Sequence, residues 1–495
     1  MIKKIVSAIL CTVLITGMLS SCGSSGLSST ETQPGTETQP FETTAADPHL
    51  DDLPDSVDLN GAVMTFLARY EEQAKTEIRV EAMNGEVIND AVFERNAAVM
   101  TRLNCEINVV DVVGVSDMAG VEKLEAAVAA GDSVYDLFCN NSYHAARTSM
   151  KGSLINLKTL EHLDLSKPYW ARYFNDSVSV GGKQYIATGP MALGFYRYLM
   201  VQLFNKNLFT EYKIDYPYEA VSNGVWTLDK LNEIAQKLYN DINGDGSADA
   251  GDQYGFYTRA NTDTSINDGF WGALNLRTAV KDEDDNYVLD IDLDHFSTSM
   301  DKLLALVNGT GTYKNADKDD NIYGSFAEGR VGVSNARLYI VEKDLLRNMS
   351  DEYGILPIPK SSDTQQSYYT MAQDQFLVYG IPVSADVSKW DDIGLFLEAY
   401  ASESYLLVKP AYYETALTIK YANDAESVEM LDLITGNMYL DPAILYIGIF
   451  PISVNTLRTQ LKNGQNTLAS TVASSETSMT AKLAEINEAY AKLEY

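Results

Sequence analysis

The sequence predicts an α/β protein in which a parallel sheet is covered by helices. Apolar, strand-like runs at 62–68, 105–113 and 135–139 alternate with helix-like segments at 86–103 and 117–130. Parallel strands need a crossover connection, and each intervening segment is long enough to supply a helix for it. The chain also has 495 residues, which is enough for two or three buried cores.

The two helix segments are predicted from their apolar spacing and their ends. In the first, positions 88, 91, 92, 99 and 103 are apolar and fall on one helical face. The second ends at Gly131, a common stop signal for helices. A polar group that includes Asn140, Asn141 and Tyr143 follows the third strand directly. In open parallel sheets, ligands bind at the carboxyl ends of the strands.

Further elements follow along the chain. Gly181 and Gly182 predict a hairpin turn, and a strand is expected at 198–204. Thr227 is a suitable N-cap for a helix over 228–239. A closing amphipathic helix is predicted near the C-terminus, and its apolar stripe indicates core packing: Met479, Leu483, Ile486, Tyr490, Leu493.

The charge balance excludes one class of partner. The chain carries 37 Lys and Arg against 69 Asp and Glu, a formal net charge of −32. An acidic protein of this kind repels phosphate backbones, so we expect no nucleic-acid partner.

The first residues predict export and a lipid anchor. A basic start, Lys3 and Lys4, is followed by an uncharged run over 5–20 and then by Leu-Ser-Ser-Cys22. This pattern resembles the lipobox of bacterial lipoproteins, which implies a signal peptide at 1–21 and lipidation of Cys22. The alternative is an ordinary cleaved signal with a chance cysteine. Residues 22–56 are predicted to be a disordered tether because they are rich in Ser, Thr, Pro and acidic residues.

Two cysteines then remain for the mature chain. Cys105 and Cys139 both lie in strand-like apolar runs. An exported protein permits a disulfide, so the sequence leaves open a bridge or two buried thiols.

The sharpest chemical motif is an acidic loop directly after the 228–239 helix. Oxygen-bearing side chains recur at positions 1, 3, 5, 9 and 12 of a twelve-residue loop, and Gly246 occupies position 6, where the chain must turn. Position 7 supplies a backbone carbonyl. The spacing predicts a structural calcium ion held by Asp241, Asn243, Asp245, Ser247, Asp249, Asp252. The shorter Asp252 replaces the usual Glu, and the alternative is an acidic solvated turn.

Several segments, taken in order, resemble a known family. Trp226-Thr-Leu-Asp-Lys-Leu with the acidic loop, Gly182-Lys-Gln-Tyr, Phe204-Asn-Lys-Asn-Leu-Phe, Phe326-Ala-Glu-Gly and Tyr353-Gly-Ile-Leu-Pro match its motifs across about 57–450. The family is that of the extracellular solute-binding proteins of ABC importers, the maltose-binding-protein-like lipoproteins. The hairpin departs from the family pattern, because Gly189-Pro190 comes later than the expected proline.

The resemblance implies a two-lobe, periplasmic-binding-protein-like (Venus flytrap) α/β fold with crossing hinge strands. The first lobe would contain 57–188 and 334–383, and the second 189–333 and 384–495. The chain would cross between lobes near 188–191 and near 334–337. The resemblance also implies a non-catalytic monomer outside the cytoplasmic membrane, held there only by its lipid, with ABC importer permease subunits as partners.

The expected ligand is a carbohydrate, an oligosaccharide in particular. Tyr outnumbers Phe by 31 to 15, and a Tyr ring offers an apolar face and a polar tip, both of which suit a sugar. The candidate ligand-binding residues are Asn140, Asn141, Tyr143, Trp271, Arg337, Tyr339, Tyr369, Tyr412. For each there is a structural alternative: the asparagines could cap a helix, the aromatics could pack in the core, and Arg337 could form an ion pair.

Three other functions stay open at this point. A peptide or another polar solute could replace the sugar within the same class. An anchored glycoside hydrolase would need two facing carboxylates, about 5–10 Å apart, and no motif indicates such a pair. A calcium-stabilised surface scaffold or adhesin would suit the loop and the tether, but such proteins are usually built from β-rich repeats.

Overall fold

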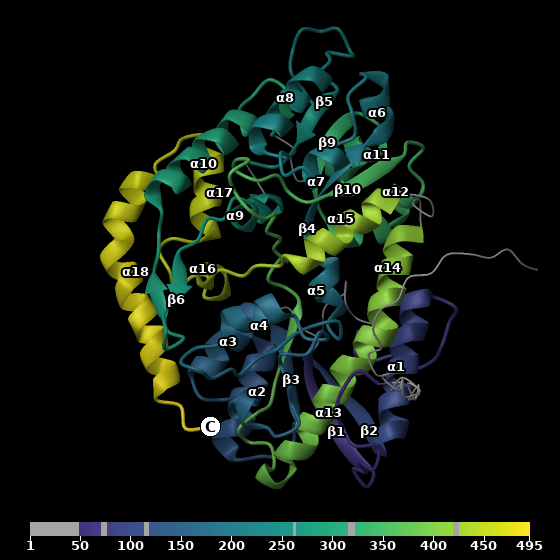
Figure 1. Cartoon of the computed structure of the whole chain (residues 1–495), viewed down its shortest axis with the longest axis vertical. Coiled ribbons are helices and arrows are strands. Elements are labelled where there is room, and N and C mark those ends of the chain that lie inside the picture. The colour runs from purple at the N-terminus through teal and green to yellow at the C-terminus, as the bar shows by residue number, and fades with distance from the viewer. Residues whose placement is uncertain (1–48, 71–76, 113–117, 261–263, 315–321, 419–424) are drawn as a thin grey trace, which may run out of the picture. The chain divides into compact units, whose positions relative to one another are not determined.

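The described part of the computed structural model contains two main sheets, each in a lobe of its own, and a smaller two-stranded sheet (Figure 1). The structure describes residues 49–70, 77–112, 118–260, 264–314, 322–418 and 425–495. The predicted signal peptide, Cys22 and most of the predicted tether therefore lie outside the described residues. Residues 49–56 pack on the folded unit: Leu53 is buried, and the Asp51 carboxylate lies 2.6 Å from Arg102. The predicted tether at 22–56 thus overlaps this unit at its end.

The first sheet has the strand order β11-β3-β1-β2. β1 pairs in parallel with both β2 and β3, which confirms the predicted parallel sheet, and β11 adds an antiparallel edge. Its strands are β1 (Ala62–Arg69), β2 (Cys105–Val112), β3 (Leu137–Asn141) and β11 (Leu377–Gly380). The helices of this lobe include α1 (Val87–Leu103), α2 (Ala119–Ala130), α3 (Ser142–Met150), α4 (Arg172–Val178), α13 (Trp390–Glu403) and α14 (Lys409–Thr418).

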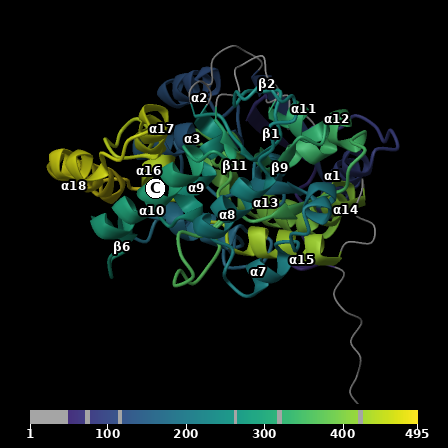
Figure 2. The ribbon, with the colours of Figure 1, turned by 90° about the horizontal axis from the view of Figure 1, so that it is seen from above.

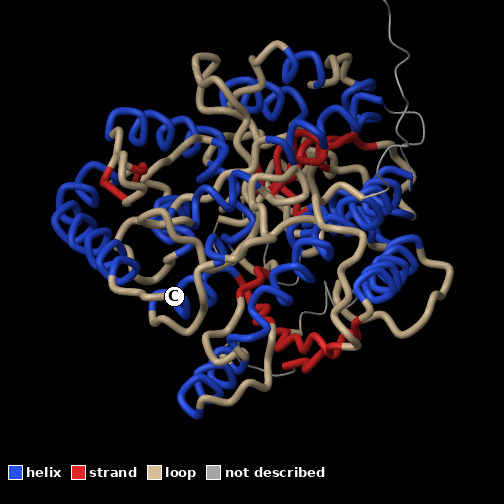
Figure 3. Tube along the Cα trace, turned by 60° about the horizontal axis from the view of Figure 1, so that its bottom comes forward, coloured by secondary structure: helices blue, strands red, loops and turns tan. Residues whose placement is uncertain are grey.

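The second sheet has the order β10-β4-β9-β5-β8. Its strands are β4 (Met200–Asn205), β5 (Tyr254–Tyr257), β8 (Thr312–Tyr313), β9 (Val331–Arg337) and β10 (Tyr353–Leu356). The helices of this lobe and of the connections are α5 (Leu193–Arg197), α6 (Lys206–Glu211), α7 (Tyr218–Ser222), α8 (Leu228–Leu238), α9 (Gly269–Ala273), α10 (Leu293–Val307), α11 (Ile322–Ala327), α12 (Asp344–Arg347), α15 (Ala425–Gly436), α16 (Pro442–Leu445) and α17 (Val454–Asn463). The coloured tube in Figure 3 shows helices surrounding both sets of strands.

Local patterns placed most of these elements correctly. Thr227 caps α8 as predicted, since its side chain accepts a hydrogen bond from Lys230 N at 3.3 Å. The closing helix is α18 (Leu468–Ala491), and it buries Met479, Leu483, Ile486 and Tyr490. Gly181 and Gly182 both have positive φ and form the predicted turn, although only an isolated bridge flanks it rather than a full hairpin.

The structure divides the chain between lobes differently from the predicted boundaries. Segment 334–383 was assigned to the first lobe, but β10 pairs with β4 in the second sheet. The chain returns to the first sheet only through the segment that leads into β11. Likewise, α13 and α14, expected in the second lobe, pack on α1 beside the first sheet. These helices follow β11 directly, so they cover the sheet that β11 has just joined.

The two remaining cysteines are free and buried. Cys105 pairs with Ala62 at one end of β1, whereas Cys139 pairs with Ala68 at the other. Six residues of strand separate their positions by about 20 Å, far beyond the reach of a disulfide. Burial raises the pKa of Cys105 to about 11, so this thiol stays protonated.

A short hairpin and the last helix connect the two lobes on one side. The hairpin consists of β6 (Ala279–Lys281) and β7 (Tyr287–Leu289), and α18 runs along the same side, at the left of Figure 1. Asp285 at the hairpin tip accepts hydrogen bonds from Ser179 Oγ at 2.8 Å and Gly182 N at 3.0 Å. Tyr490 of α18 bonds Ser149 of α3 at 2.7 Å.

Candidate functional site

The crossing segment 371–376 leads from the second lobe into β11 and is tied to the start of β4. Met200 N donates to Met371 O at 2.8 Å, and Gln373 N donates to Tyr198 O at 2.9 Å. Polar residues of both lobes lie around this segment, and Asn140 and Asn141 stand directly before one of them, Ser142, with the Asn140 amide facing Gly120 of α2. We call them the interlobe cluster: Arg69, Asn140, Asn141, Ser142, Ser265, Asp268, Arg337, Asp374, Gln375 and Arg458.

On the first-lobe side, strand ends hold the crossing segment. Arg69, the last residue of β1, donates to Gln375 Oε1 at 2.7 Å. Gln375 Nε2 donates to Asp374 Oδ1 at 3.0 Å, which orients that carboxylate. Ser142, directly after β3, donates to Asp374 O at 3.4 Å. The ends of β1 and β3 therefore meet at one place, as expected for a parallel sheet.

On the second-lobe side, the interlobe cluster is bounded by an ion pair. Arg458 of α17 donates from Nε to Asp268 Oδ1 at 2.8 Å and from Nη2 to Oδ2. Burial raises the pKa of Asp268 to about 6, and Arg458 opposes that rise. The carboxylate of Asp374 raises this pKa further, and the guanidinium of Arg337 lowers it. These three residues are thus close enough to interact electrostatically.

Several buried donors in the cluster have no acceptor among the described residues. The side-chain amides of Asn140 and Asn141 lack hydrogen-bond partners at Nδ2, although both residues are fully buried. Arg337 donates from Nη2 to Ser265 Oγ at 2.9 Å, but its Nε has no partner. A buried donor without an acceptor costs about 1–3 kcal/mol. Such groups are rare in folded proteins and call for an explanation.

The predicted site residues fall into four groups. Asn140, Asn141 and Arg337 belong to the interlobe cluster. Asn141 also caps α3, because its Oδ1 accepts a hydrogen bond from His144 N at 3.1 Å. The rings of Tyr143 and Tyr339 lie near these residues in sequence and pack on His144 and Tyr198, respectively.

Two predicted aromatics are buried in packed surroundings. Trp271 is 1% exposed, and its ring packs edge-on against Phe296, with the centroids 5.9 Å apart. Tyr412 is fully buried beside Tyr196, at 5.7 Å between centroids. Neither ring offers a free face in this conformation.

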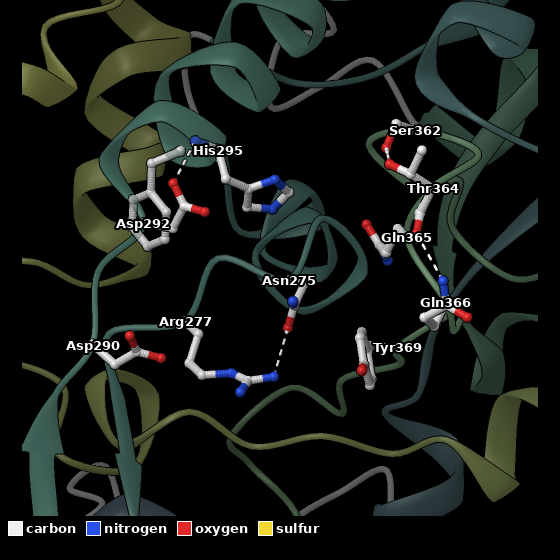
Figure 4. Close-up of a pocket in the computed structure, with 11 residues that line it drawn as sticks. Asn275, Arg277, Asp290, Asp292, His295, Ser362, Thr364, Gln365, Gln366 and Tyr369 are labelled. Carbon is white, nitrogen blue, oxygen red and sulfur yellow. Dashed lines mark hydrogen bonds between the residues drawn. The ribbon is translucent and has the colours of Figure 1, made fainter.

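Tyr369 lies elsewhere, in a polar pocket of about 450 Å³ in the second lobe (Figure 4). Three connections line it, before β6, before α10 and over 362–369. Arg277 donates to Asn275 Oδ1 at 3.3 Å, and Asp292 accepts from His295 N at 3.0 Å. Tyr369 is five residues before Asp374, so the pocket adjoins the crossing segment.

The predicted calcium loop is described in full. Asp241 accepts hydrogen bonds from Gly244 N at 2.7 Å and Gly246 N at 2.9 Å, and Gly246 has a φ of +75°. Asp252 is 1% exposed, and its Oδ1 has no hydrogen-bond partner among the described residues. In the described part of the chain, no three His, Cys, Asp or Glu side chains converge closely enough to form a ready metal site. Calcium binding therefore stays a prediction.

The fold is that of the two-lobe ABC sugar-binding proteins, which confirms the predicted fold class. A sugar transporter from Rhizobium etli, solved in an open conformation, superposes with a TM-score of 0.55 at 15% identity over 88% of this chain and 100% of that one. A cyclo/maltodextrin-binding protein complexed with maltotetraose gives 0.55 at 16% identity over 86% and 97%. A cyclic α-maltosyl-1,6-maltose binding protein from Arthrobacter globiformis gives 0.54 at 13% over 86% and 99%. No protein-family model and no curated protein matches the sequence.

Sequence reasoning missed Asp268, Asp374 and Arg458. Asp268 stands three residues before Trp271, so sequence reasoning selected a neighbouring side chain of the same segment. Arg458 is the only arginine in 348–495, and a single arginine in so long a segment could have drawn notice. Asp374 carries no such signal.

Proposed function

We propose that this protein captures a carbohydrate, an oligosaccharide in particular, between its two lobes and delivers it to an ABC importer. One observation carries the proposal: the interlobe cluster contains buried amide and guanidinium donors that lack acceptors. Sugar hydroxyls are acceptors as well as donors, so a bound sugar can satisfy these groups. The three structural neighbours described above are named for sugars, and their likeness supports the proposal.

The placement of the cluster supports closure of the two lobes on a bound ligand. Its residues come from both lobes and from the crossing segment, so a ligand that contacts all three favours the closed arrangement. The importer would then distinguish loaded protein from empty protein by the distance between the lobes.

Simple capture fits the site better than hydrolysis. Asp268 and Asp374 are two carboxylates in one cluster, but Arg458 contacts both oxygens of Asp268. A general acid must release a proton to the leaving group, and this ion pair leaves no such oxygen free.

The test is a thermal-shift screen of the purified protein against mono- and oligosaccharides, peptides and amino acids, with product analysis for each sugar. A ligand at 100 times its dissociation constant adds about 2.7 kcal/mol to the free energy of unfolding. We expect this stabilisation from one class of sugar, with no turnover. Stabilisation by peptides alone, or cleavage of a sugar, would contradict the proposal.

We also propose that the loop over 241–252 binds a structural calcium ion. The orphan Oδ1 of Asp252 and the turn at Gly246 support this. Calcium should raise the melting temperature relative to chelator, and Asp245→Asn should abolish that rise. Asp284→Asn, in a different acidic turn, is the control. A rise that survives Asp245→Asn would place the ion elsewhere.

The proposed location is the outer face of the cytoplasmic membrane, with Cys22 as a lipid-bearing anchor. In the described part of the chain, none of the helices combines the length and apolarity that a membrane span requires. Cys22→Ser should release the protein from the membrane fraction in cell fractionation. Retention of that variant would contradict lipid anchoring.

A further inference from the structure

A second pocket, of about 290 Å³, lies beside the first crossing between the lobes. One wall comes from 168–174 of the first lobe, and Pro190 contributes from the crossing itself. The opposite wall comes from α14 and from α15, which packs on β10 of the second sheet. Figures 1 and 2 both place α14 and α15 on one side of the molecule and α17 on the other. This pocket is therefore separate from the interlobe cluster.

Aromatic rings dominate the pocket. The aromatic lining residues are Trp170, Tyr173, Phe174, Phe195, Tyr196 and Tyr405. Most of these rings are held firmly: Trp170 Nε1 donates to Glu398 at 3.1 Å, and Phe174 packs edge-on against Phe195. Tyr173, in contrast, is 54% exposed. The pocket thus presents a fixed aromatic wall and one accessible ring.

The polar groups of the pocket include two opposite charges without ion pairs. Lys409 Nζ lies 4.4 Å from the Tyr405 ring centroid, and no carboxylate of the described residues lies within 4.0 Å of it. Asp432 on α15 likewise has no cation within that distance among the described residues. Thr435 Oγ1 accepts a hydrogen bond from Tyr413 at 2.9 Å. A ligand that both donates and accepts hydrogen bonds would match this arrangement.

We propose that this pocket is a second carbohydrate site, which holds one or two sugar rings. The aromatic faces suit the C–H face of a sugar, while Lys409 and Asp432 suit its hydroxyls. The volume is near the lower end for ligand pockets, about 300 Å³, so a long oligosaccharide does not fit inside.

Ligands at this pocket and at the interlobe cluster are coupled, an inference that rests on the proposed function. The segment 168–174 and α14 belong to the first lobe, whereas α15 packs on the second sheet, so hinge motion changes the distance between 168–174 and α15. A ligand that contacts both walls favours one distance. Each ligand then changes the affinity of the other by the same factor.

Fluorine NMR of the protein labelled with 5-fluorotryptophan tests both sites separately. The chain has four Trp, and Trp→Phe variants assign the resonances. Trp170 reports the aromatic pocket, and Trp271, three residues after Asp268, reports the interlobe cluster. The probes are glucose, maltose, maltotetraose and, as a non-sugar, benzoate. We expect glucose or maltose to shift the Trp170 resonance with saturation.

Variants decide whether that shift comes from the pocket. Tyr173→Ala and Asp432→Asn should each raise the dissociation constant measured at Trp170 by at least about 10-fold. Glu429→Gln, an exposed carboxylate on α15 outside this pocket, should leave it unchanged. A ligand that saturates the interlobe cluster should change the dissociation constant measured at Trp170 by about 5-fold or more.

The outcomes separate the two proposals. A sugar that moves Trp271 but never Trp170 overturns the second site and leaves the proposed function in place. A sugar that moves only Trp170 supports the second site and counts against the proposed function. A response to benzoate alone, or a shift unchanged in both variants, overturns the carbohydrate assignment. If the dissociation constant measured at Trp170 is the same with and without a ligand that saturates the interlobe cluster, the proposed coupling is overturned.

Discussion

Two buried polar networks in this molecule differ in how completely they are paired. In the first lobe, Glu398 of α13 is 1% exposed and accepts hydrogen bonds from Tyr169, from Trp170 Nε1 at 3.1 Å and from Asp164 N at 3.2 Å. Both carboxylate oxygens are used, and both aromatic donors have an acceptor. The interlobe cluster, in contrast, buries the amides of Asn140 and Asn141 with Nδ2 unpaired.

On the proposed function, this difference distinguishes polar groups that only stabilise the fold from those that bind the sugar. A complete network stabilises one packing, and its loss leaves buried donors without acceptors. An incomplete network costs stability until a ligand completes it. Burial and charge alone would not have distinguished the two networks, because both contain buried carboxylates with a raised pKa.

The largest effect is expected where the complete network is broken. Glu398→Ala removes the acceptor of Tyr169 and Trp170, and each orphaned donor costs about 1–3 kcal/mol. We expect the free energy of unfolding to fall by about 3 kcal/mol or more in denaturant titrations, with unchanged sugar affinity at the interlobe cluster of the folded protein. Glu161→Ala, an exposed control nearby, should change stability by less than about 0.5 kcal/mol. If Glu398→Ala also lowered the sugar affinity of the interlobe cluster, the two networks would not have the separate roles that the comparison gives them.

The pH dependence of stability sharpens the comparison. Burial raises the pKa of Glu398 to about 7 and that of Asp268 to about 6, from ordinary values of 4.5 and 3.8. Folding thus favours the neutral acids, so their stabilisation is complete below about pH 4 and is lost as pH rises through 6 and 7. Each contributes about 3 kcal/mol over its window. Denaturant unfolding between pH 4 and 8 measures this loss.

A bound sugar should distinguish these two carboxyls. An oligosaccharide too long for the aromatic pocket at Trp170 would, when bound at the interlobe cluster, contact the surroundings of Asp268 but not those of Glu398, so it should shift the titration of Asp268 alone. Carboxyl ¹³C NMR with and without sugar checks this, and Asp268→Asn identifies the resonance. Equal shifts of both resonances would show a global change instead.

The sequence predicted elements well where periodicity or a terminal signal defines them. The expected helix at 86–103 is Val87–Leu103, and the expected strand at 62–68 is Ala62–Arg69. Asn140 and Asn141 were selected as candidates because they stand at the carboxyl end of a strand in a parallel sheet, where ligands bind in such folds; whether they bind a ligand stays a prediction. Such signals are local, so one sequence is enough to detect them.

Contacts between distant segments could not be predicted in this way. Arg458 meets Asp268 across 190 positions, and Ser142 meets Asp374 across 232. Nothing in the four residues of β10 indicates which sheet they join, so the lobe boundary was misplaced. These pairings depend on how whole helices and sheets pack, and a local sequence pattern does not predict that packing.

Arg337 tests the incomplete network directly. Arg337→Ala removes a charged donor whose Nε has no partner in the described protein, so we expect sugar affinity to fall about 10- to 100-fold in calorimetric titrations. The melting temperature should change little, because the orphaned group disappears as well. Arg347→Ala, exposed on α12, is the control. Unchanged affinity with lowered stability would assign Arg337 to the structural network.

The smallest effect is expected at Asn141, which belongs to both kinds of network. Its Oδ1 caps α3 through His144 N, while its Nδ2 lacks an acceptor. Asn141→Ala removes both groups, whereas Asn141→Ser keeps a capping oxygen and removes only the amide donor. Asn141→Ala should therefore be about 1 kcal/mol less stable than Asn141→Ser in denaturant titrations, and both should lose sugar affinity equally. If Asn141→Ser bound sugar as tightly as the unaltered protein, the unpaired amide would have no part in binding, and Asn141 would be a helix cap alone.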